Sequence, residues 1–176
     1  MRSVFGEYRA PTGVGKAISN SAEGLDDIRA AVEAVSSRLG RRIKFVVGKP
    51  GLDGHSNGAE QIAVRARDCG IDVVYEGIRL TPAQIVSAAQ EEGAHVVGLS
   101  VLSGSHMELI GEVIDRMRAA GLEDVPVVAG GIIPEDDAKA LLAMGVARIY
   151  TPKDFEMNRI MMDVVALVGE AGREAA

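Results

Sequence analysis

The sequence predicts an α/β fold in which helices cover both faces of a parallel sheet. Three observations favour this class. Short apolar runs alternate with longer segments of helical period from residue 43 onward. Gly and Pro residues separate these segments. The composition is 47% hydrophobic but only 3% aromatic, and small apolar side chains suit the close packing of helices on a sheet.

The segment before the first expected strand has two parts. Residues 1–22 show no hydrophobic period and are rich in Gly, Ser and Thr, which is typical of a linker or arm. Residues 23–39 place apolar side chains at helical spacing and end at Gly40, which predicts a helix. We therefore divide the chain into an N-terminal arm with its helix, residues 1–40, and one domain, residues 41–176.

Strands and helices alternate through the rest of the chain. We expect strands at 43–47, 71–75, 95–100, 125–129 and 147–150, and helices at 57–69, 82–92, 105–120, 134–144 and 154–168. Connections between parallel strands are right-handed. The favoured arrangement is therefore a flavodoxin-like (Rossmann-like) doubly wound sheet of five strands in the order 2-1-3-4-5.

Residues typical of helix ends support these boundaries. Helix starts are expected at Thr81-Pro82 and at Pro134. The single cysteine, Cys69, comes at the end of a helix and is expected to be a small buried residue. Helix stops are expected at Gly70, Gly93, Gly121 and Gly145.

Charge and hydropathy argue against several classes of function. The net charge is −6 and the Lys and Arg residues are scattered, so we do not expect nucleic acid as a main partner. No apolar stretch reaches the length of a membrane span, and the first ten residues lack the apolar core of a signal peptide. A single cysteine fits a reducing compartment. We therefore expect a cytoplasmic protein without a membrane partner.

The loop after the first expected strand carries an Asp and a His two residues apart. It reads GKPGLDGHSNG and contains Asp53, His55 and Gly58. Open parallel sheets bind their ligands beyond the carboxyl ends of the strands. A carboxylate beside an imidazole can hold one ring nitrogen as N–H and leave the other free for a metal. An isolated loop histidine often has no functional role, so the interpretation of His55 as a metal ligand depends on the other motifs in the sequence.

Two further motifs come at the ends of the third and fourth expected strands. Ser100 and Leu102 form a Ser-x-Leu motif at the end of the third strand, and Gly130-Gly131 follow the fourth. In the order 2-1-3-4-5, the switch point lies between strands 1 and 3. The loops that carry His55 and Ser100 are therefore expected to meet.

In this order and spacing, Asp-x-His-x-x-Gly, Ser-x-Leu and Gly-Gly resemble the cobalamin-binding domain of the His-on enzymes. That family includes the acyl-CoA mutases, glutamate mutase, methionine synthase and the corrinoid methyl-transfer proteins. The resemblance covers residues 42 to about 169. It implies that His55 is the lower axial ligand of the cobalt of cobalamin, displacing the dimethylbenzimidazole of the cofactor. Asp53 would accept the N–H of His55, and Lys49 would pair with Asp53 unless it is a solvated loop cation.

The same resemblance implies a place for the displaced nucleotide tail. Ser100 would hydrogen-bond to the dimethylbenzimidazole, and Leu102 would line its pocket. Gly130 and Gly131 would leave a channel because they lack side chains. The alternatives are a serine that caps a loop and a plain turn at a strand end. The other residues expected to bind the cofactor are Gly51, Gly54, Ser56, Asn57, Gly58, Val101, Ser103, Tyr150 and Thr151, of which the three glycines would permit close backbone approach and positive φ.

The remaining histidines and the methionines of the last helix have plainer interpretations. His106 lies at the start of a helix, where we favour a polar helix-start residue over a contact to the corrin rim. His95 begins a strand and is expected to be structural. Met157, Met161 and Met162 are interpreted as core residues.

Two flanking segments resemble the ethylmalonyl-CoA mutases, within the methylmalonyl-CoA mutase family. One is Val4 to Gly15, which is similar to the linker between their catalytic barrel and cobalamin domain, and the other is Ile149 to Val168. The resemblance implies an adenosylcobalamin-binding domain of a carbon-skeleton isomerase that acts on an acyl-CoA such as ethylmalonyl-CoA. It implies a TIM-barrel domain or subunit as partner and allows a homo-oligomer. We expect no catalytic residue in this chain and no activity from the chain alone.

Other functions fit the sequence less well. Corrinoid proteins for methyl transfer usually carry a helical bundle before the cobalamin fold. In this chain only one expected helix, residues 23–39, precedes the first strand. A cobalamin-binding sensor module remains an alternative function, although no output segment is evident. A signalling receiver needs a phosphoacceptor Asp after the third strand, where this chain has Ser100. The stretch Thr12 to Lys16, TGVGK, lacks the spacing of a phosphate loop.

Overall fold

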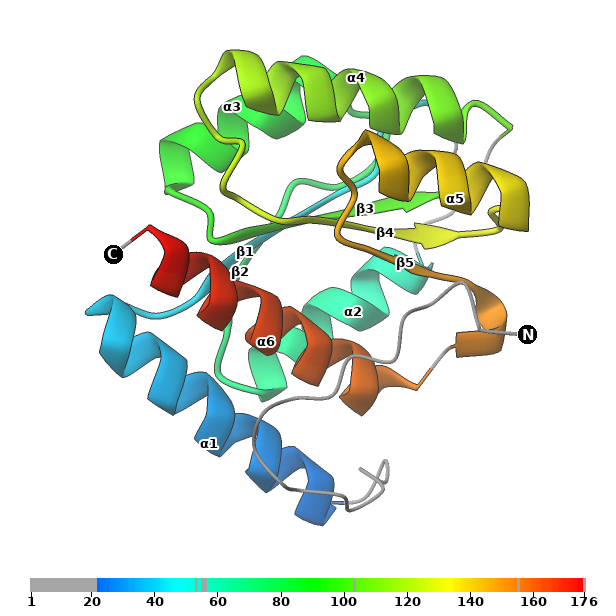
Figure 1. Cartoon of the computed structure of the whole chain (residues 1–176). Coiled ribbons are helices and arrows are strands. Elements are labelled where there is room, and N and C mark those ends of the chain that lie inside the picture. The colour runs from blue at the N-terminus through cyan, green and yellow to red at the C-terminus, as the bar shows by residue number, and fades with distance from the viewer. Residues whose placement is uncertain (1–21, 53, 55–56, 103, 155, 176) are drawn as a thin grey trace.

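A computed structural model describes residues 22–52, 54, 57–102, 104–154 and 156–175. Five parallel strands form one sheet in the order β2-β1-β3-β4-β5, and helices cover both faces of it (Figure 1). The predicted fold class and strand order are confirmed. The predicted Val4 to Gly15 linker lies outside the described residues.

The elements follow the predicted alternation closely. Helices α3, α4 and α5 lie on one face of the sheet, and α1, α2 and α6 lie on the other (Figure 1). The strands are β1 (Lys44–Gly48), β2 (Asp72–Tyr75), β3 (Val96–Val101), β4 (Val127–Gly131) and β5 (Arg148–Tyr150). The helices are α1 (Ala22–Leu39), α2 (Asn57–Asp68), α3 (Pro82–Glu92), α4 (His106–Ala119), α5 (Glu135–Met144), the 3-10 turn η1 (Pro152–Asp154) and α6 (Met157–Glu174).

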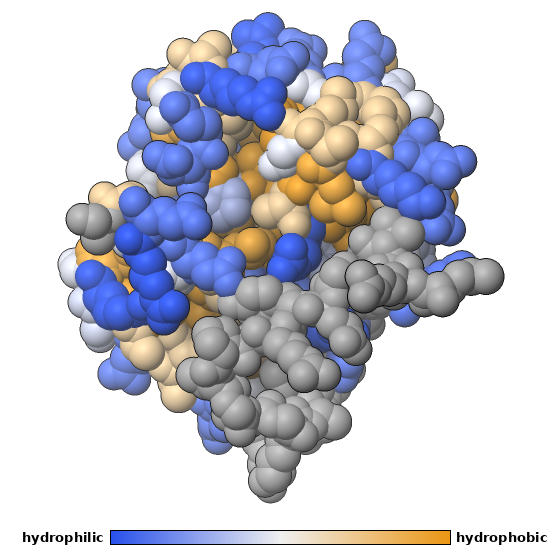
Figure 2. Space-filling view, viewed as in Figure 1, coloured by the Kyte–Doolittle hydropathy of each residue, from blue (hydrophilic) through white to orange (hydrophobic). Residues whose placement is uncertain are grey.

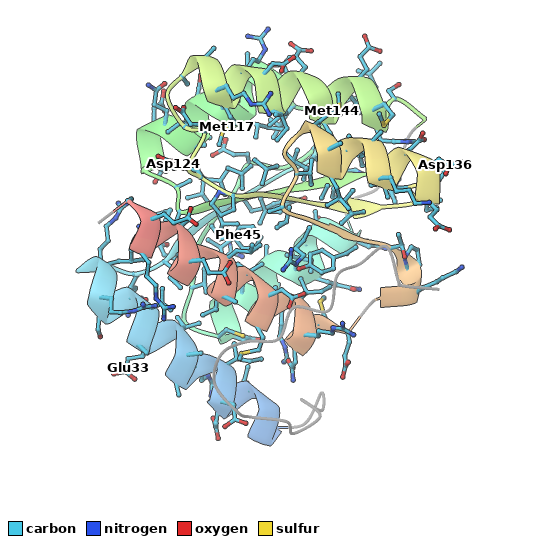
Figure 3. The ribbon with its side chains drawn as sticks, in the orientation of Figure 1. Glu33, Phe45, Met117, Asp124, Asp136 and Met144 are labelled. Atoms are coloured by element: carbon cyan, nitrogen blue, oxygen red, sulfur yellow. The ribbon has the colours of Figure 1, made fainter. Side chains whose placement is uncertain are left out.

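Each face of the sheet has its own apolar core. Strand side chains alternate between the faces, so Val97 and Leu99 pack with α3 and α4, whereas Phe45 and Val128 pack with α2 and α6. Figure 3 shows Phe45 near the centre of the molecule, with Glu33 and Asp136 directed outward. Hydrophilic residues cover much of the outer helix surfaces, and hydrophobic residues show mainly in the band between the two helical layers (Figure 2). Burial on both faces explains why the strands read as continuous apolar runs.

The helix ends predicted from Thr81-Pro82, Gly93 and Gly145 are confirmed. The Thr81 side chain accepts the backbone N–H of Gln84, and the Gln84 side chain accepts the N–H of Thr81, which makes a capping box before α3. Gly93 and Gly145 end α3 and α5 in the left-handed conformation, with φ of 61° and 116°. Cys69, just after α2, is buried as expected.

The fourth strand is longer at its carboxyl end than predicted. The sequence placed Gly130 and Gly131 after a strand at 125–129, but β4 extends from Val127 to Gly131. Gly130 pairs with Ser100 and Gly131 pairs with Val101 in the parallel ladder. Glycine has low strand propensity, so this continuation comes from tertiary pairing with β3 and not from local preference.

The last helix also differs from its predicted range of 154–168. The chain first makes the turn η1, and α6 then begins at Met157 and continues to Glu174. Gly169 and Gly172 lie against α1, where a built Cβ would come within 3.0 Å of Arg38 Nη2 and 3.1 Å of Leu39 Cδ2, respectively. These glycines therefore let α1 and α6 approach closely. The division of the chain at residue 40 stays a prediction.

Two of the three methionines of α6 are less buried than predicted. Met161 is fully buried, whereas Met157 and Met162 are only partly buried. Among the described residues, no helix is both long and apolar enough to cross a membrane.

Candidate functional site

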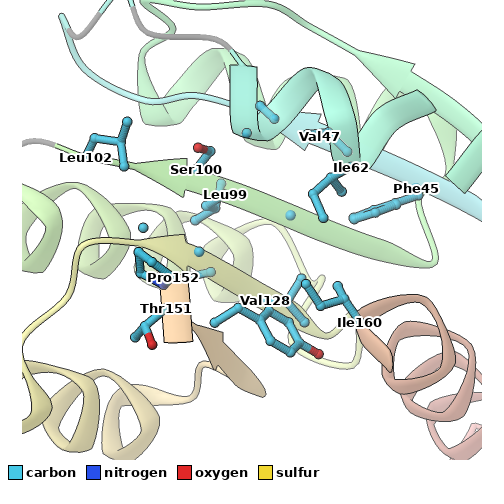
Figure 4. A pocket seen from close by; sticks show the side chains of 17 residues that line it. Phe45, Val47, Ile62, Leu99, Ser100, Leu102, Val128, Thr151, Pro152 and Ile160 are labelled. Carbon is cyan, nitrogen blue, oxygen red and sulfur yellow. The ribbon is translucent and has the colours of Figure 1, made fainter. Parts of the chain in front are cut away.

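A cavity of about 370 Å³ lies on the α2 and α6 face of the sheet. Figure 4 shows Leu99 and Ser100 on β3 and Leu102 just beyond its end. It shows Ile62 of α2 on one side of the cavity and Thr151 and Pro152 on the other. The lining is mostly apolar and consists of Phe45, Val47, Gly58, Ala59, Ile62, Gly98, Leu99, Ser100, Leu102, Val128, Ala129, Gly130, Gly131, Tyr150, Thr151, Pro152 and Ile160.

Small residues on one face of β3 and β4 give this cavity its depth. Gly98 accommodates the ring of Phe45, since a built Cβ on Gly98 would lie 2.7 Å from Phe45 Cε2. A built Cβ on Gly130 has Tyr150 O as its nearest neighbour at 3.7 Å, which is an ordinary contact. A built Cβ on Gly58, at the start of α2, has no neighbour within 4 Å. Side chains at positions 58 and 130 would therefore occupy open space.

Seven of the predicted cofactor-binding residues line this cavity. They come from four separate parts of the chain, at the start of α2, the ends of β3 and β4, and the end of β5. Parallel strands bring these segments to one edge of the sheet, as the switch-point argument predicted. The seven residues are Gly58, Ser100, Leu102, Gly130, Gly131, Tyr150 and Thr151.

The predicted role of Gly131 needs a correction, because the absence of a side chain at this position makes room for the backbone of β3. Its φ is 154°, and a built Cβ would overlap the carbonyl oxygen of Val101. The predicted role of a channel glycine therefore fits Gly130 and not Gly131. Val101 does not line the cavity, because its side chain is buried in the core on the opposite face of the sheet, and its predicted cofactor contact stays a prediction.

The start of the loop after β1 is held by the segment before α3. Gly51 N donates to Leu80 O at 3.0 Å, and Leu80 N donates to Lys49 O at 3.2 Å. Lys49 is 0% exposed, so its alternative interpretation as a solvated loop cation is wrong. Gly51 has the expected positive φ, at 93°, whereas Gly58 lies in the first turn of α2 and does not.

Four predicted site residues, Asp53, His55, Ser56 and Ser103, lie outside the described residues. The described flanks place the His55 loop between the end of β1 and Asn57, the exposed first residue of α2. The proposed pairings of Asp53 with His55 and with Lys49 therefore stay predictions. The described residues contain no group of three or more His, Cys, Asp or Glu side chains arranged to hold a metal ion.

Exposed apolar side chains follow three neighbouring strands at the edge that carries the cavity. Leu52 lies in the loop after β1 and is 88% exposed, Leu102 follows β3 and Ile132 follows β4 and is 66% exposed. Leu102 also lines the cavity. A cluster of exposed large apolar side chains commonly marks a binding surface.

Tyr150, which lines the cavity, makes a polar contact with α6. The Tyr150 hydroxyl donates to Asp163 Oδ2 of α6 at 3.1 Å. Burial raises the pKa of Tyr150, and the neighbouring Asp163 charge raises it further. Burial also raises the pKa of the Asp163 carboxyl, an effect that the hydrogen bond from Tyr150 opposes.

The two described histidines have structural partners. His106 Nε2 lies 2.7 Å from Asp137 Oδ2, which ties the buried start of α4 to the first turn of α5. His95 Nδ1 accepts the backbone N–H of Lys44 at 2.9 Å. The other ring nitrogen of His95, Nε2, lies 3.2 Å from Arg41 Nε, which donates to it. Burial and the charges of Arg41 and Lys44 lower the pKa of His95.

Sequence reasoning missed much of the apolar lining, although a signal was present. In a strand, every second residue faces the same side of the sheet. Counting back by two from Ser100 gives Gly98, and counting back by two from Gly130 gives Val128. The other lining residues without a sequence-based role include Phe45, Val47, Ala59, Ile62, Pro152 and Ile160.

The size and lining of the cavity suit a small and mostly apolar group. Its volume falls within the range of roughly 300–1,000 Å³ that is usual for small-molecule sites. The model of the B12 binding domain family matches residues 43–156, which include every strand and the whole cavity lining except Ile160. The chain belongs to the B12-binding domain family.

Individual relatives of this B12-binding domain are mutases. It is 70% identical over 168 residues to ethylmalonyl-CoA mutase of Cereibacter sphaeroides, covering 96% of this chain and 26% of that protein. It is 34% identical over 130 residues to the 2-hydroxyisobutanoyl-CoA mutase small subunit of Aquincola tertiaricarbonis, covering 74% of this chain and 95% of that one. The chain thus spans about a quarter of the first relative and nearly all of the second.

A solved structure with the same fold comes from a cobalamin-binding protein of Desulfitobacterium hafniense. The two structures align with a TM-score of 0.63 at 21% identity, covering 81% of this chain and 70% of that one. At this identity, the similarity supports the fold alone.

Proposed function

We propose that this domain binds cobalamin with the dimethylbenzimidazole base displaced, and that His55 is the lower ligand of cobalt. The cavity, which we call the tail slot, would take the displaced nucleotide tail. The observation that carries this proposal is the convergence of Gly58, Ser100, Gly130 and Tyr150 on one apolar cavity at the carboxyl edge of the sheet. The His55 loop leads directly into α2, which forms a wall of that cavity.

Each wall of the tail slot has a role in this proposal. The Ser100 hydroxyl is a polar group among apolar neighbours and would hydrogen-bond to a ring nitrogen of the base. Gly130 and Gly58 leave the width that a flat ring requires. Ile62, Leu102 and Val128 would cover the ring and exclude water.

The corrin ring would then lie over the carboxyl edge of the sheet. The exposed side chains of Leu52, Leu102 and Ile132 follow three strands at this edge and offer an apolar seat. Asp53 would hold one nitrogen of His55 as N–H, so that the other nitrogen stays free for cobalt. Only a neutral imidazole can be a ligand, so proton binding to His55 competes with ligation.

We further propose that the domain works as the cofactor-binding part of an acyl-CoA mutase, and that ethylmalonyl-CoA is the substrate. The 70% identity to an ethylmalonyl-CoA mutase supports this choice. Adenosylcobalamin, when bound, supplies a cobalt–carbon bond whose cleavage starts the rearrangement. A catalytic TIM-barrel domain or subunit would bind the substrate, since a barrel of about 250 residues is longer than this whole chain. A cytoplasmic location stays a prediction.

The corrinoid methyl-transfer alternative has less support. Mutases are the relatives with which the sequence shares 70% and 34% identity. A single helix, α1, precedes β1 in the described residues, and it packs against α6 beside the sheet.

The visible spectrum of the cobalamin complex tests the ligand assignment. The parent chain should give a spectrum with a histidine ligand, and His55→Ala should lose it. Free imidazole at a pH that keeps it neutral should restore the spectrum of His55→Ala, which controls for a general loss of binding. A spectrum that is the same in the parent and in His55→Ala would exclude His55 as the ligand.

A turnover assay tests the mutase proposal. The chain with adenosylcobalamin should not convert ethylmalonyl-CoA or methylmalonyl-CoA, because nothing in it resembles a substrate barrel. Turnover should appear only when a barrel-containing partner is added. Measurable conversion by the chain alone would refute this division of labour.

A further inference from the structure

Arg79 is the one non-glycine residue with positive φ in the described part of the chain. It lies in the loop between β2 and α3, and its φ is 58°. The left-handed region is unfavourable for a side chain with a Cβ. Such a conformation in a residue that carries a fixed positive charge suggests a function for the side chain that it places.

This conformation places the guanidinium group beside Gly54, in the segment that follows β1. A Cβ built on Gly54 would lie 3.6 Å from Arg79 Nη2. The backbone around Arg79 is well held, because the adjacent Leu80 exchanges hydrogen bonds with Lys49 and Gly51 and forms a bridge with Pro50. The guanidinium therefore lies next to Gly54, which separates Asp53 from His55 in the sequence.

The Arg79 side chain is exposed and lies outside the tail slot. It makes no hydrogen bond or ion pair with any residue in the described ranges, and it does not line the cavity. The tail slot extends from β1 toward β3, β4 and β5, whereas the Arg79 loop follows β2, on the other side of β1. Its ligand is therefore not the base held in the slot.

We propose that Arg79 is a cofactor-binding residue that donates hydrogen bonds to amide carbonyl groups at the edge of the corrin ring. This inference rests on the proposed binding of cobalamin at His55. Neighbouring strands are about 4.8 Å apart, so a macrocycle centred above the β1 loop extends over the ends of β2 and β3. The planar guanidinium carries five N–H donors and no acceptor, which suits carbonyl oxygens. The phosphate of the nucleotide tail is the other acceptor in cobalamin that could attract it.

Three substitutions separate the side chain from the backbone and from general charge. Arg79→Asn removes the cation but tolerates left-handed φ, because Asn is enriched there. Arg79→Gly removes the cation and relieves the backbone. Arg42→Ala is the matched control, since Arg42 is an exposed arginine at the opposite end of β1. Thermal unfolding checks that all three variants are folded.

The experiment measures dissociation constants for cobalamin and for cobinamide, which keeps the corrin amides but lacks the nucleotide tail. We expect both Arg79 variants to bind each ligand about ten-fold more weakly than the parent, as for the loss of a charge-assisted hydrogen bond. Arg42→Ala should bind like the parent. A loss confined to cobalamin would assign Arg79 to the tail phosphate and overturn the proposal. Unchanged binding of both ligands, or an equal loss in Arg42→Ala, would overturn it too.

Failure of this inference is distinct from failure of the proposed function. If the parent binds cobalamin and the Arg79 variants bind equally well, only the role of Arg79 is lost. If the parent chain does not bind cobalamin, the proposed function and this inference both fall.

Discussion

The Tyr150 hydroxyl donates a hydrogen bond of 3.1 Å to Asp163 Oδ2. Tyr150 ends β5 and lines the tail slot, whereas Asp163 lies on α6. The bond therefore ties one wall of the slot to the helix that packs against the sheet on this side. It also provides a hydrogen-bond donor for a half-buried carboxylate, which would otherwise lose part of its hydration without compensation.

We expect Tyr150→Phe to destabilise the protein. The substitution removes the donor and leaves the Asp163 carboxylate with a missing partner, which should lower the free energy of unfolding by about 1–3 kcal/mol. Urea denaturation measures this change. Tyr75→Phe is a matched control, because the buried Tyr75 hydroxyl has no hydrogen-bond partner among the described residues. An equal loss in both variants would mean that the bond to Asp163 contributes nothing specific.

The raised pKa of Asp163 gives a prediction about pH. Its folded pKa lies above the ordinary value of 3.8, so the folded state binds the proton more tightly than the unfolded chain does. The stabilisation from this group is therefore fully present below the ordinary value and is lost as pH rises through the folded pKa. Asp163→Asn keeps an acceptor for Tyr150 and removes the titration.

The stability difference between Asp163→Asn and the parent should therefore change with pH. Relative to the parent, the variant should gain stability as pH rises from about 3 to about 7. Urea denaturation at several pH values measures both proteins. A difference that is constant across this range, or one that favours the parent at higher pH, would contradict the assignment.

Gly130 and Gly131 should behave differently although they are neighbours. Gly130→Val adds side-chain volume in open space and should weaken cobalamin binding by at least about ten-fold, or about 1.4 kcal/mol, while cobinamide binding stays unchanged. Gly131→Ala would overlap the Val101 carbonyl oxygen and should lower the free energy of unfolding by more than about 1 kcal/mol. Ligand titration and urea denaturation measure the two effects. Equal weakening of both ligands by Gly130→Val would argue against this place for the tail.

The sequence predicted the fold well because local signals agreed with the final structure. The capping box at Thr81 and the left-handed glycines at 93 and 145 fix helix ends by short-range geometry. Strand order followed from general rules of connection and handedness. These features need no knowledge of how distant side chains pack.

Features that depend on distant contacts were predicted less well. Gly130 and Gly131 extend β4 only because β3 pairs with them, and the α6 helix passes through Gly169 and Gly172 because α1 packs there. The contact of His106 with Asp137 joins two residues that are 31 positions apart on different helices, and it leaves no local signal in the sequence. The packing of the Phe45 ring over Gly98 also leaves no local signal, because it depends on the pairing of β1 with β3.

The central claim is that a nitrogen of His55 replaces dimethylbenzimidazole below the cobalt, and electron paramagnetic resonance of the cob(II)alamin complex tests it most directly. The single ligand nitrogen splits each cobalt line, and the pattern depends on the nitrogen isotope. If a protein histidine is the ligand, uniform ¹⁵N labelling of the chain with unlabelled cofactor should convert triplets into doublets, and His55→Ala should abolish that conversion. Triplets that persist in the labelled parent would show that the cofactor's own base remains on the cobalt, which contradicts the account.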